Sequence, residues 1–236
     1  MRQDDLIPAG EGRGIDVALQ RADDLDNKSL QFIQNIIHKQ NAVKALDVAC
    51  GSGGHSVRMA LMGAEVSASD ILDRADDVIT LAATMGVEKQ VQFQVTDMQE
   101  LSQHYRQEFD VVVCQRAIHY LPYQQALVAL KEMKKVLSSN GRLYISASGL
   151  HSELSQGYEA KNTPVKARFA QLEQTVARHH DIMHPVCLYA EEDLQKALEA
   201  AGFEVESIFS STFGNIKAIA KKWQHKSMLT SQVLPI

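Results

Sequence analysis

The segment at 45–54, ALDVACGSGG, holds the residues best suited to chemistry: one acid and three closely spaced glycines. Gly51, Gly53 and Gly54 permit backbone dihedral angles that other residues resist, and they place no side chain in the way of a ligand. Asp47 precedes this loop, where a carboxylate would repel a phosphate but would attract a cationic or amine-bearing ligand. An apolar run that passes into such a loop is typical of a small-ligand site at the carboxyl edge of a sheet.

Alternating strands and helices are predicted to position this loop. Apolar runs and period-two alternation predict strands at 43–49, 65–69, 91–95, 109–114, 142–147, 203–210 and 213–220. Helical periodicity predicts helices at about 27–39, 56–61, 74–84, 123–137 and 164–177, and a last helix that ends at Gly202. Strands that alternate with helices at this spacing imply an α/β fold with a mostly parallel sheet covered on both faces.

The stretch at about 150–189 interrupts this alternation. It is polar and rich in histidine and charge, so we interpret it as an insertion over the ligand edge, where lids and substrate pockets usually lie. His180 and His184 are four residues apart, but Pro185 argues against a regular helix there. Since no spacing fits a familiar ligand set, we expect no metal site.

Composition narrows the class of protein. The 236 residues, 45% of them hydrophobic, suffice for one large α/β domain, and the net charge of −5 argues against a broad nucleic-acid or membrane surface. The three cysteines form no CxxC pair, so neither a structural zinc site nor a disulfide framework is expected. The N-terminus lacks the apolar core of a signal peptide and no run reaches transmembrane length, so we expect a cytoplasmic protein without a membrane partner.

Taken in order, the motifs resemble those of class I S-adenosylmethionine-dependent methyltransferases, in the small-molecule branch, over roughly residues 27–222. The loop resembles the family's first motif, acid-apolar-Gly-x-Gly-x-Gly, with Ala49 in place of the first glycine. The segments VSASD at 66–70, TDM at 96–98, FDVVVCQ at 109–115 and NGRL at 140–143 resemble later motifs of the family. The resemblance implies a Rossmann-like, doubly wound, mostly parallel seven-stranded sheet with a C-terminal antiparallel hairpin and a helical insertion before the last helix.

The same resemblance implies the cofactor S-adenosyl-L-methionine, with S-adenosyl-L-homocysteine as its product. Asp70 would accept hydrogen bonds from two ribose hydroxyls. Asp97 would accept one from the adenine amino group, while Met98 and Ile71 pack on the ring. Asp47 would approach the cationic methionine end. The expected cofactor-binding residues are Asp47, Ala49, Gly51, Gly53, Asp70, Ile71, Asp97, Met98 and Gln115.

Methyl transfer from a sulfonium is an in-line displacement by an already activated reagent. The protein therefore mainly aligns the reactants and excludes water, and it needs a general base only for a poor nucleophile. His119 is the candidate base because its ordinary pKa lies near neutrality, and packing around the pocket is its alternative role. We expect Arg116, Tyr120 and Tyr158 to contact the substrate.

Other functions stay open. Gly51-x-Gly53 with a downstream acid also suits an NAD-dependent oxidoreductase, although that fingerprint wants a glycine where this chain has Ser56. A methyltransferase acting on tRNA or another macromolecule is a further alternative, as is a domain that binds S-adenosylmethionine without catalysis. The acidic balance and the insertion favour a small-molecule acceptor over nucleic acid.

We divide the chain into three parts. Residues 1–42 are expected to form an N-terminal arm and helix that cap the site. Residues 43–222 would form the class I methyltransferase domain, with the lid or substrate insertion at about 150–189, and residues 223–236 a tail. We expect a monomer or a homodimer.

Overall fold

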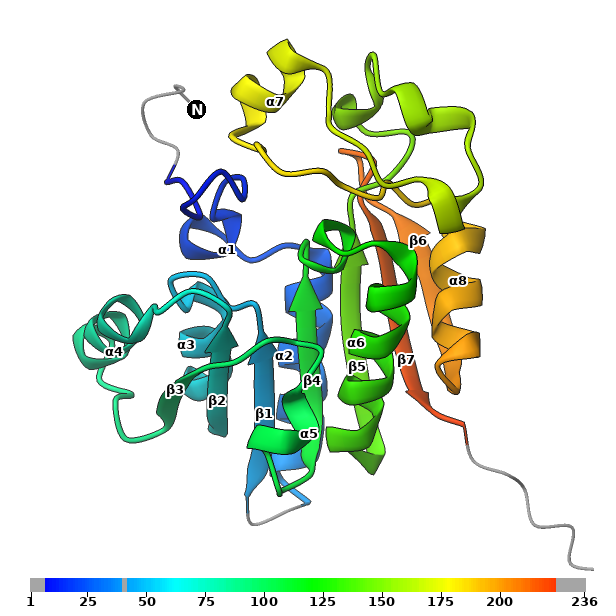
Figure 1. The fold of residues 1–236 in the computed structure, drawn as a ribbon. Coiled ribbons are helices and arrows are strands. Elements are labelled where there is room, and N and C mark those ends of the chain that lie inside the picture. The colour runs from blue at the N-terminus through cyan, green and yellow to red at the C-terminus, as the bar shows by residue number, and fades with distance from the viewer. Residues whose placement is uncertain (1–6, 40–41, 224–236) are drawn as a thin grey trace, which may run out of the picture.

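A seven-stranded sheet lies at the centre of the molecule, for which the computed structural model describes residues 7–39 and 42–223. The strands are β1 Val43–Val48, β2 Ala64–Asp70, β3 Val91–Val95, β4 Phe109–Gln115, β5 Leu137–Ala147, β6 Phe203–Ser210 and β7 Ile216–Lys222. Their order is β3-β2-β1-β4-β5-β7-β6, in which β1 to β5 are parallel and β7 runs antiparallel to β5 and β6 (Figure 1). The structure thus confirms the doubly wound sheet with a closing antiparallel hairpin.

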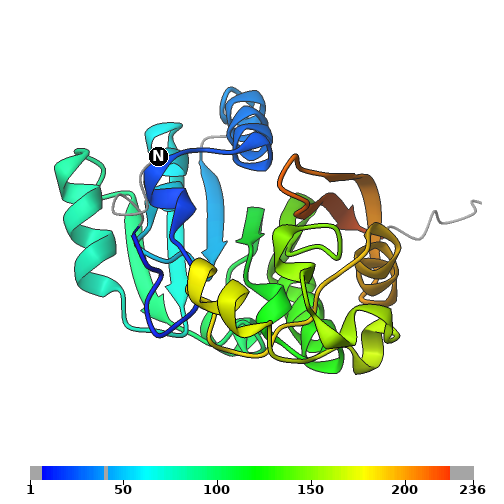
Figure 2. The same ribbon diagram turned by 90° about the horizontal axis from the view of Figure 1, so that it is seen from above.

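Helices cover both faces of this sheet (Figure 2). The α-helices of the described residues are α1 Val17–Gln20, α2 Asp24–Ile37, α3 Gly54–Leu61, α4 Ala75–Thr84, α5 Leu101–His104, α6 Tyr123–Val136, α7 Gln174–His180 and α8 Glu191–Ala200. Of these, α1 and α7 lie above the carboxyl edge of the sheet (Figure 1). Helices α2 and α3 bury Ile33 and Met59 in the core on one face, whereas α6 and α8 bury Leu130 and Leu198 on the other. Burial on both faces explains why β1 and β4 are mostly apolar.

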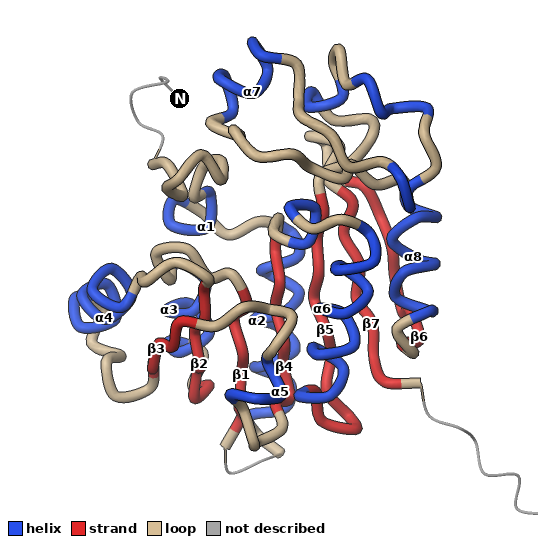
Figure 3. The backbone as a smooth tube through the Cα atoms, viewed as in Figure 1, coloured by secondary structure: helices blue, strands red, loops and turns tan. Residues whose placement is uncertain are grey.

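The direction of winding reverses between β1 and β4. β2 and β3 follow on one side of β1, and β4 and β5 lie on the other. In open α/β sheets, ligands bind beyond the carboxyl ends of the strands at this reversal. Figure 3 shows the loops that follow these strand ends gathered at one edge of the sheet.

The N-terminal arm, residues 7–21, meets the insertion above that edge (Figure 1). Gly14 N donates to Asp181 O at 2.7 Å, and Met183 N donates to Gly12 O at 2.8 Å. Arg13 forms an isolated antiparallel bridge with Ile182. Two segments that are far apart in sequence therefore form a joint cover over the carboxyl edge.

Two predicted elements differ from the structure. The helix expected at 164–177 is wrong: a 3-10 turn, Val165–Ala167, precedes an extended segment, and α7 begins only at Gln174. Backbone pairing of Ala170 with Val186 holds the extended segment and outweighs its helical periodicity. β5 begins at Leu137, five residues before the predicted start, since Leu137 pairs with Phe109 across the sheet.

Other boundaries agree within three residues. Within the described ranges, no helix has the length and apolar character needed to cross a bilayer. Of the tail expected at 223–236, only Trp223 belongs to the described residues. The division at 42 and 222 stays a prediction.

Candidate functional site

The glycine loop joins β1 to α3 through a series of left-handed residues. Ala49 has φ 56°, Gly51 φ 56° and Gly53 φ 82°. The left-handed conformation costs an alanine about 1 kcal/mol, which the surrounding hydrogen bonds must offset. A Cβ on Gly54 would lie 2.3 Å from Ala18 O, so only glycine allows the arm to pack this closely on the start of α3.

Asp70 anchors this loop from the end of β2. Its Oδ2 accepts a hydrogen bond from Gly51 N at 3.1 Å, and its Oδ1 accepts one from Leu72 N at 3.0 Å. These bonds use one acceptor position on each oxygen, and a carboxylate oxygen has capacity for more. Asp70 is therefore held in place and still available to a ligand.

Asp47 is a buried carboxylate with one direct side-chain partner among the described residues. Its side chain is 4% exposed and its Oδ2 accepts a hydrogen bond from Ser56 Oγ at 2.6 Å. Burial raises the pKa of Asp47 to about 7, the Ser56 hydroxyl opposes the rise, and repulsion from neighbouring carboxylates adds to it. A nearby cation would favour the ionised form.

A cavity of about 370 Å³ opens between these groups. Ten of the sequence-predicted site residues line it: Asp47, Ala49, Gly51, Asp70, Ile71, Asp97, Met98, Gln115, Arg116 and Tyr120. Gly53 does not line it and instead caps the start of α3. The volume is in the range of small-ligand sites.

His119 lies outside the cavity lining. It is 2% exposed, it belongs to a 3-10 turn after β4, and its ring nitrogens lie 3.4–3.5 Å from Ser148. Burial, aided by the charge of Arg116, lowers the pKa of His119 to about 3. A neutral, buried ring of this kind suits the packing role better than proton transfer.

Tyr158 also lies away from the cavity. Its hydroxyl donates to Val186 O at 2.7 Å and lies 3.1 Å from Arg168 O, so it ties the insertion together. The insertion instead presents Phe169, His184 and Pro185 to the cavity.

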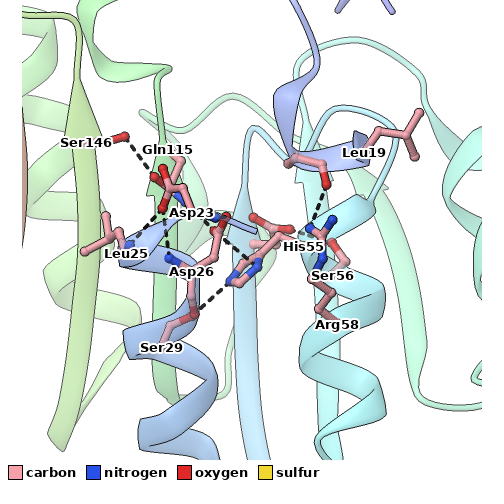
Figure 4. A network of polar contacts seen from close by, with 12 residues as sticks. Leu19, Asp23, Leu25, Asp26, Ser29, His55, Ser56, Arg58, Gln115 and Ser146 are labelled. Carbon is pink, nitrogen blue, oxygen red and sulfur yellow. Dashed lines mark hydrogen bonds and ion pairs between the residues drawn. The ribbon is translucent and has the colours of Figure 1, made fainter. Parts of the chain in front are cut away.

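A polar network in the wall of the cavity joins the predicted Gln115 to residues that were not predicted (Figure 4). Asp26, at the third position of α2, accepts a hydrogen bond from Gln115 Nε2, and Asp26 Oδ1 lies 3.2 Å from His55 Nδ1. His55 Nε2 lies 3.0 Å from Ser29 Oγ, and Gln115 Oε1 accepts from Ser146 Oγ at 3.1 Å. The network fixes the Gln115 amide at the end of β4. Burial lowers the pKa of His55 although the Asp26 charge opposes this.

A capping box was the signal that could have located Asp26. Asp23 accepts from Leu25 N and Asp26 N, and Asp26 in turn accepts from Asp23 N at 2.8 Å. This reciprocal pattern marks a helix start three residues before the predicted one.

Asp16 reaches the glycine loop from the arm. Its Oδ2 accepts from Ser52 N at 2.8 Å and its Oδ1 accepts from Leu19 N at 3.0 Å. Nothing in the local sequence pattern indicates this contact, which depends on how the arm folds over the sheet.

The cavity is lined by more acids than bases. Five carboxylates line it, namely Asp16, Asp26, Asp47, Asp70 and Asp97, against two guanidinium groups, Arg13 and Arg116. This balance favours a ligand with a net positive charge. In residues 7–39 and 42–223, no group of three or more histidine, cysteine, aspartate or glutamate residues is arranged to hold a metal ion.

Comparison with protein families and curated proteins gives one consistent result. The family described as "Methyltransferase domain" matches residues 39–202. The ubiquinone biosynthesis O-methyltransferase of Idiomarina loihiensis is 32% identical over 117 residues, which are 50% of this chain and 47% of that protein. The protein of the same name from Xanthomonas oryzae is 30% identical over 105 residues, 44% of this chain and 42% of that protein. These alignments span less than half the length of either relative.

Solved structures share the fold. An S-adenosylmethionine-dependent methyltransferase from Clostridium acetobutylicum superposes with a TM-score of 0.64 at 15% identity, over 88% of this chain and 95% of that one. Magnesium protoporphyrin IX methyltransferase from Synechocystis, with S-adenosylhomocysteine bound, gives a TM-score of 0.58 at 16% identity, over 84% and 83% of the two chains.

Proposed function

Since this chain belongs to the methyltransferase-domain family, we propose that it binds S-adenosylmethionine in the cavity beyond β1 and β4 and transfers the methyl group to a small-molecule acceptor. The observation that carries the proposal is the line of carboxylates from Asp97 through Asp70 to Asp47 along one acidic cavity. S-Adenosylmethionine carries a sulfonium and an ammonium against one carboxylate, so its net charge is positive.

The nucleoside end fits the residues after β2 and β3. Asp70 has free acceptor positions for the two ribose hydroxyls. Ile71 is 51% exposed at the cavity, where it offers an apolar surface to a ring, and Met98 lies in the same lining. Asp97 accepts from Gln99 N through Oδ1 and from Gln99 Nε2 at 3.3 Å through Oδ2, and a carboxylate oxygen has capacity for a further bond to an amino group.

The methionine end fits the residues after β1 and β4. Asp47 and Asp26 supply negative charge for an ammonium, and the Gln115 amide is held between Asp26 and Ser146. The bound cofactor supplies an activated methyl group; the chain's own residues bind, orient and shield it. Because the arm and the insertion meet above the cavity, they exclude water from the reactants.

An oxygen acceptor is the proposal that the curated relatives support, since both are named as O-methyltransferases. We further propose a cytoplasmic location, which the three free, buried cysteines support. A macromolecular acceptor would instead require a broad surface leading to the cavity, which the acidic balance of the chain disfavours.

Calorimetric titration of the full chain with S-adenosylmethionine and with NADH tests the cofactor. Binding of S-adenosylmethionine alone supports the proposal, and binding of NADH alone overturns it in favour of an oxidoreductase. Formation of S-adenosylhomocysteine across a panel of small acceptors then separates an enzyme from a domain that only binds the cofactor. Strong, salt-sensitive binding of tRNA would contradict a small acceptor.

A further inference from the structure

Two arginines line the cavity without a hydrogen-bond partner for Nε. Arg13 comes from the arm and Arg116 follows β4. Within the part of the chain that the structure describes, the buried Nε atoms of both side chains have no hydrogen-bond partner. A buried guanidinium nitrogen that lacks a partner is costly, so a site that keeps two of them is suited to an anion.

Among the described residues, the acids near Arg116 leave its Nε atom without a hydrogen-bond partner. Asp16 accepts from the glycine loop and α1, and Asp26 accepts from Gln115. Asp23 pairs with Lys217 at 2.8 Å. These charges oppose the effect of burial, which lowers the pKa of Arg116, and each carboxylate also interacts with another residue.

The backbone of Arg116 is held in an unfavourable conformation. Its φ is 51°, and Arg116 N donates to Ser146 O at 3.1 Å and lies 3.0 Å from Ser146 Oγ. A left-handed, non-glycine residue fixed this way is typical of functional sites, where the surroundings impose the strain.

Tyr120 and an apolar wall complete the surroundings. A Cβ on Gly14 would lie 3.2 Å from the Tyr120 hydroxyl, so the arm passes directly over this phenol. Burial raises the pKa of Tyr120 despite the nearby Arg13 and Arg116 charges, so the neutral hydroxyl can donate a hydrogen bond. Leu121 and Phe169 line the same cavity and suit an apolar ligand body.

We propose that Arg13 and Arg116 form a carboxylate site and that the methyl acceptor is a small carboxylic acid with an apolar body, methylated on its carboxylate oxygen. This inference rests on the proposed function. A lone pair of the carboxylate oxygen forms the new O–CH3 bond while the S–CH3 bond breaks, and its electron pair goes to sulfur. The carboxylate and sulfonium charges disappear together and no proton moves.

This chemistry agrees with two features of the site. A carboxylate is ionised near neutral pH, so it needs no general base, and His119 does not line the cavity. The ester product has no charge, so the two arginines lose their anionic partner and the product is held less tightly than the substrate.

The carboxylate of the cofactor's methionine is the other source of the same chemistry. Binding of S-adenosylhomocysteine, which has this carboxylate, and of 5′-methylthioadenosine, which lacks it, separates the two sources. If the acceptor is the source, Arg116→Gln changes the affinity for both nucleosides by less than about threefold. If Arg116→Gln instead weakens the binding of S-adenosylhomocysteine alone, by about tenfold or more, the arginines bind the carboxylate of the cofactor and the proposal is overturned.

Benzoate and its neutral analogue benzamide are the acceptor probes, measured by NMR titration of the full chain saturated with S-adenosylhomocysteine. We expect benzoate to bind at least about tenfold more tightly than benzamide, and Arg116→Gln to reduce this preference to about twofold or less. Arg13→Gln, a substitution in the arm, should also reduce the preference for benzoate, and this result would not depend on whether Arg116→Gln folds. Lys131→Gln, an exposed change of the same charge on α6, should leave it intact.

Equal binding of the two probes by the unsubstituted protein would overturn the carboxylate site, as would a preference that survives both arginine substitutions. Failure of the unsubstituted protein to bind S-adenosylhomocysteine at all would instead overturn the proposed function. The two failures are therefore distinguishable.

Discussion

Replacing Asp47 by asparagine tests whether this buried carboxylate, which lowers the stability of the folded protein, serves to bind a cation. The side chain is 4% exposed, and burial raises its pKa to about 7 from an ordinary value of 3.8. Asparagine has nearly the same shape and can still accept the hydrogen bond from Ser56, so the substitution mainly removes the charge.

The sign and size of the effect follow from proton linkage. Because folded Asp47 binds its proton more tightly than the unfolded chain does, the folded state loses stability as pH rises from about 4 to about 7. A shift of about three units at about 1.4 kcal/mol each gives a destabilisation of up to about 4 kcal/mol at about pH 8. Relative to the unsubstituted chain, Asp47→Asn should therefore gain about 2–3 kcal/mol between about pH 5 and pH 8.

The same substitution should weaken the cofactor complex. Binding of a cation to the unsubstituted protein requires ionised Asp47, so affinity for S-adenosylmethionine should fall about tenfold per pH unit below about 7. Asp47→Asn should bind more weakly and with little dependence on pH. Denaturant unfolding and calorimetric titration over this range measure both effects. Two results would contradict this role of Asp47: an Asp47→Asn variant that is less stable than the unsubstituted protein at about pH 8, or an affinity of the unsubstituted protein for S-adenosylmethionine that does not change with pH.

Three further substitutions probe other contacts. Asp70→Ala should weaken S-adenosylhomocysteine binding about 10- to 100-fold, through lost bonds to a charged acceptor, while unfolding stays cooperative; unchanged affinity would disprove the ribose role. His119→Gln should change the rate of S-adenosylhomocysteine formation less than about threefold, and a loss of about a hundredfold at unchanged stability would restore His119 as a base. Arg168→Ala should lower the free energy of unfolding by about 3 kcal/mol in denaturant titration, because it removes the guanidinium that lies 2.6 Å from Asp193 Oδ2 in the unsubstituted protein. A loss below about 0.5 kcal/mol would show that this ion pair does not hold the insertion.

The sheet was largely predictable because its strands are buried on both faces. The apolar residues of β1, the apolar run at 111–114 in β4 and the alternation at β3 are local signals, and the observed strands match them. The insertion was not predictable in the same way. The non-local pairing of Ala170 with Val186 and the partly buried Arg168–Asp193 ion pair outweigh its helical periodicity at 164–177. Such contacts depend on the rest of the fold being in place.

The candidate site divides along the same line. Asp47, Asp70 and Asp97 follow or end parallel strands, so the carboxyl ends of the sheet bring them to one edge, and all three line the cavity. Asp16 and His55 were missed, since the first depends on how the arm docks and the second on burial against Asp26. A loop sequence does not specify which way a side chain points, which is why His119 was expected in a cavity that it does not line.

A crystal structure of the full chain with S-adenosylhomocysteine would show whether the cofactor binds in the cavity beyond β1 and β4. We expect the ribose hydroxyls on Asp70, the adenine between Ile71 and Met98, and the amino-acid end towards Asp47 and Gln115, below the arm and the insertion. The ligand seated away from β1 and β4, or with its ribose on residues other than Asp70, would contradict it.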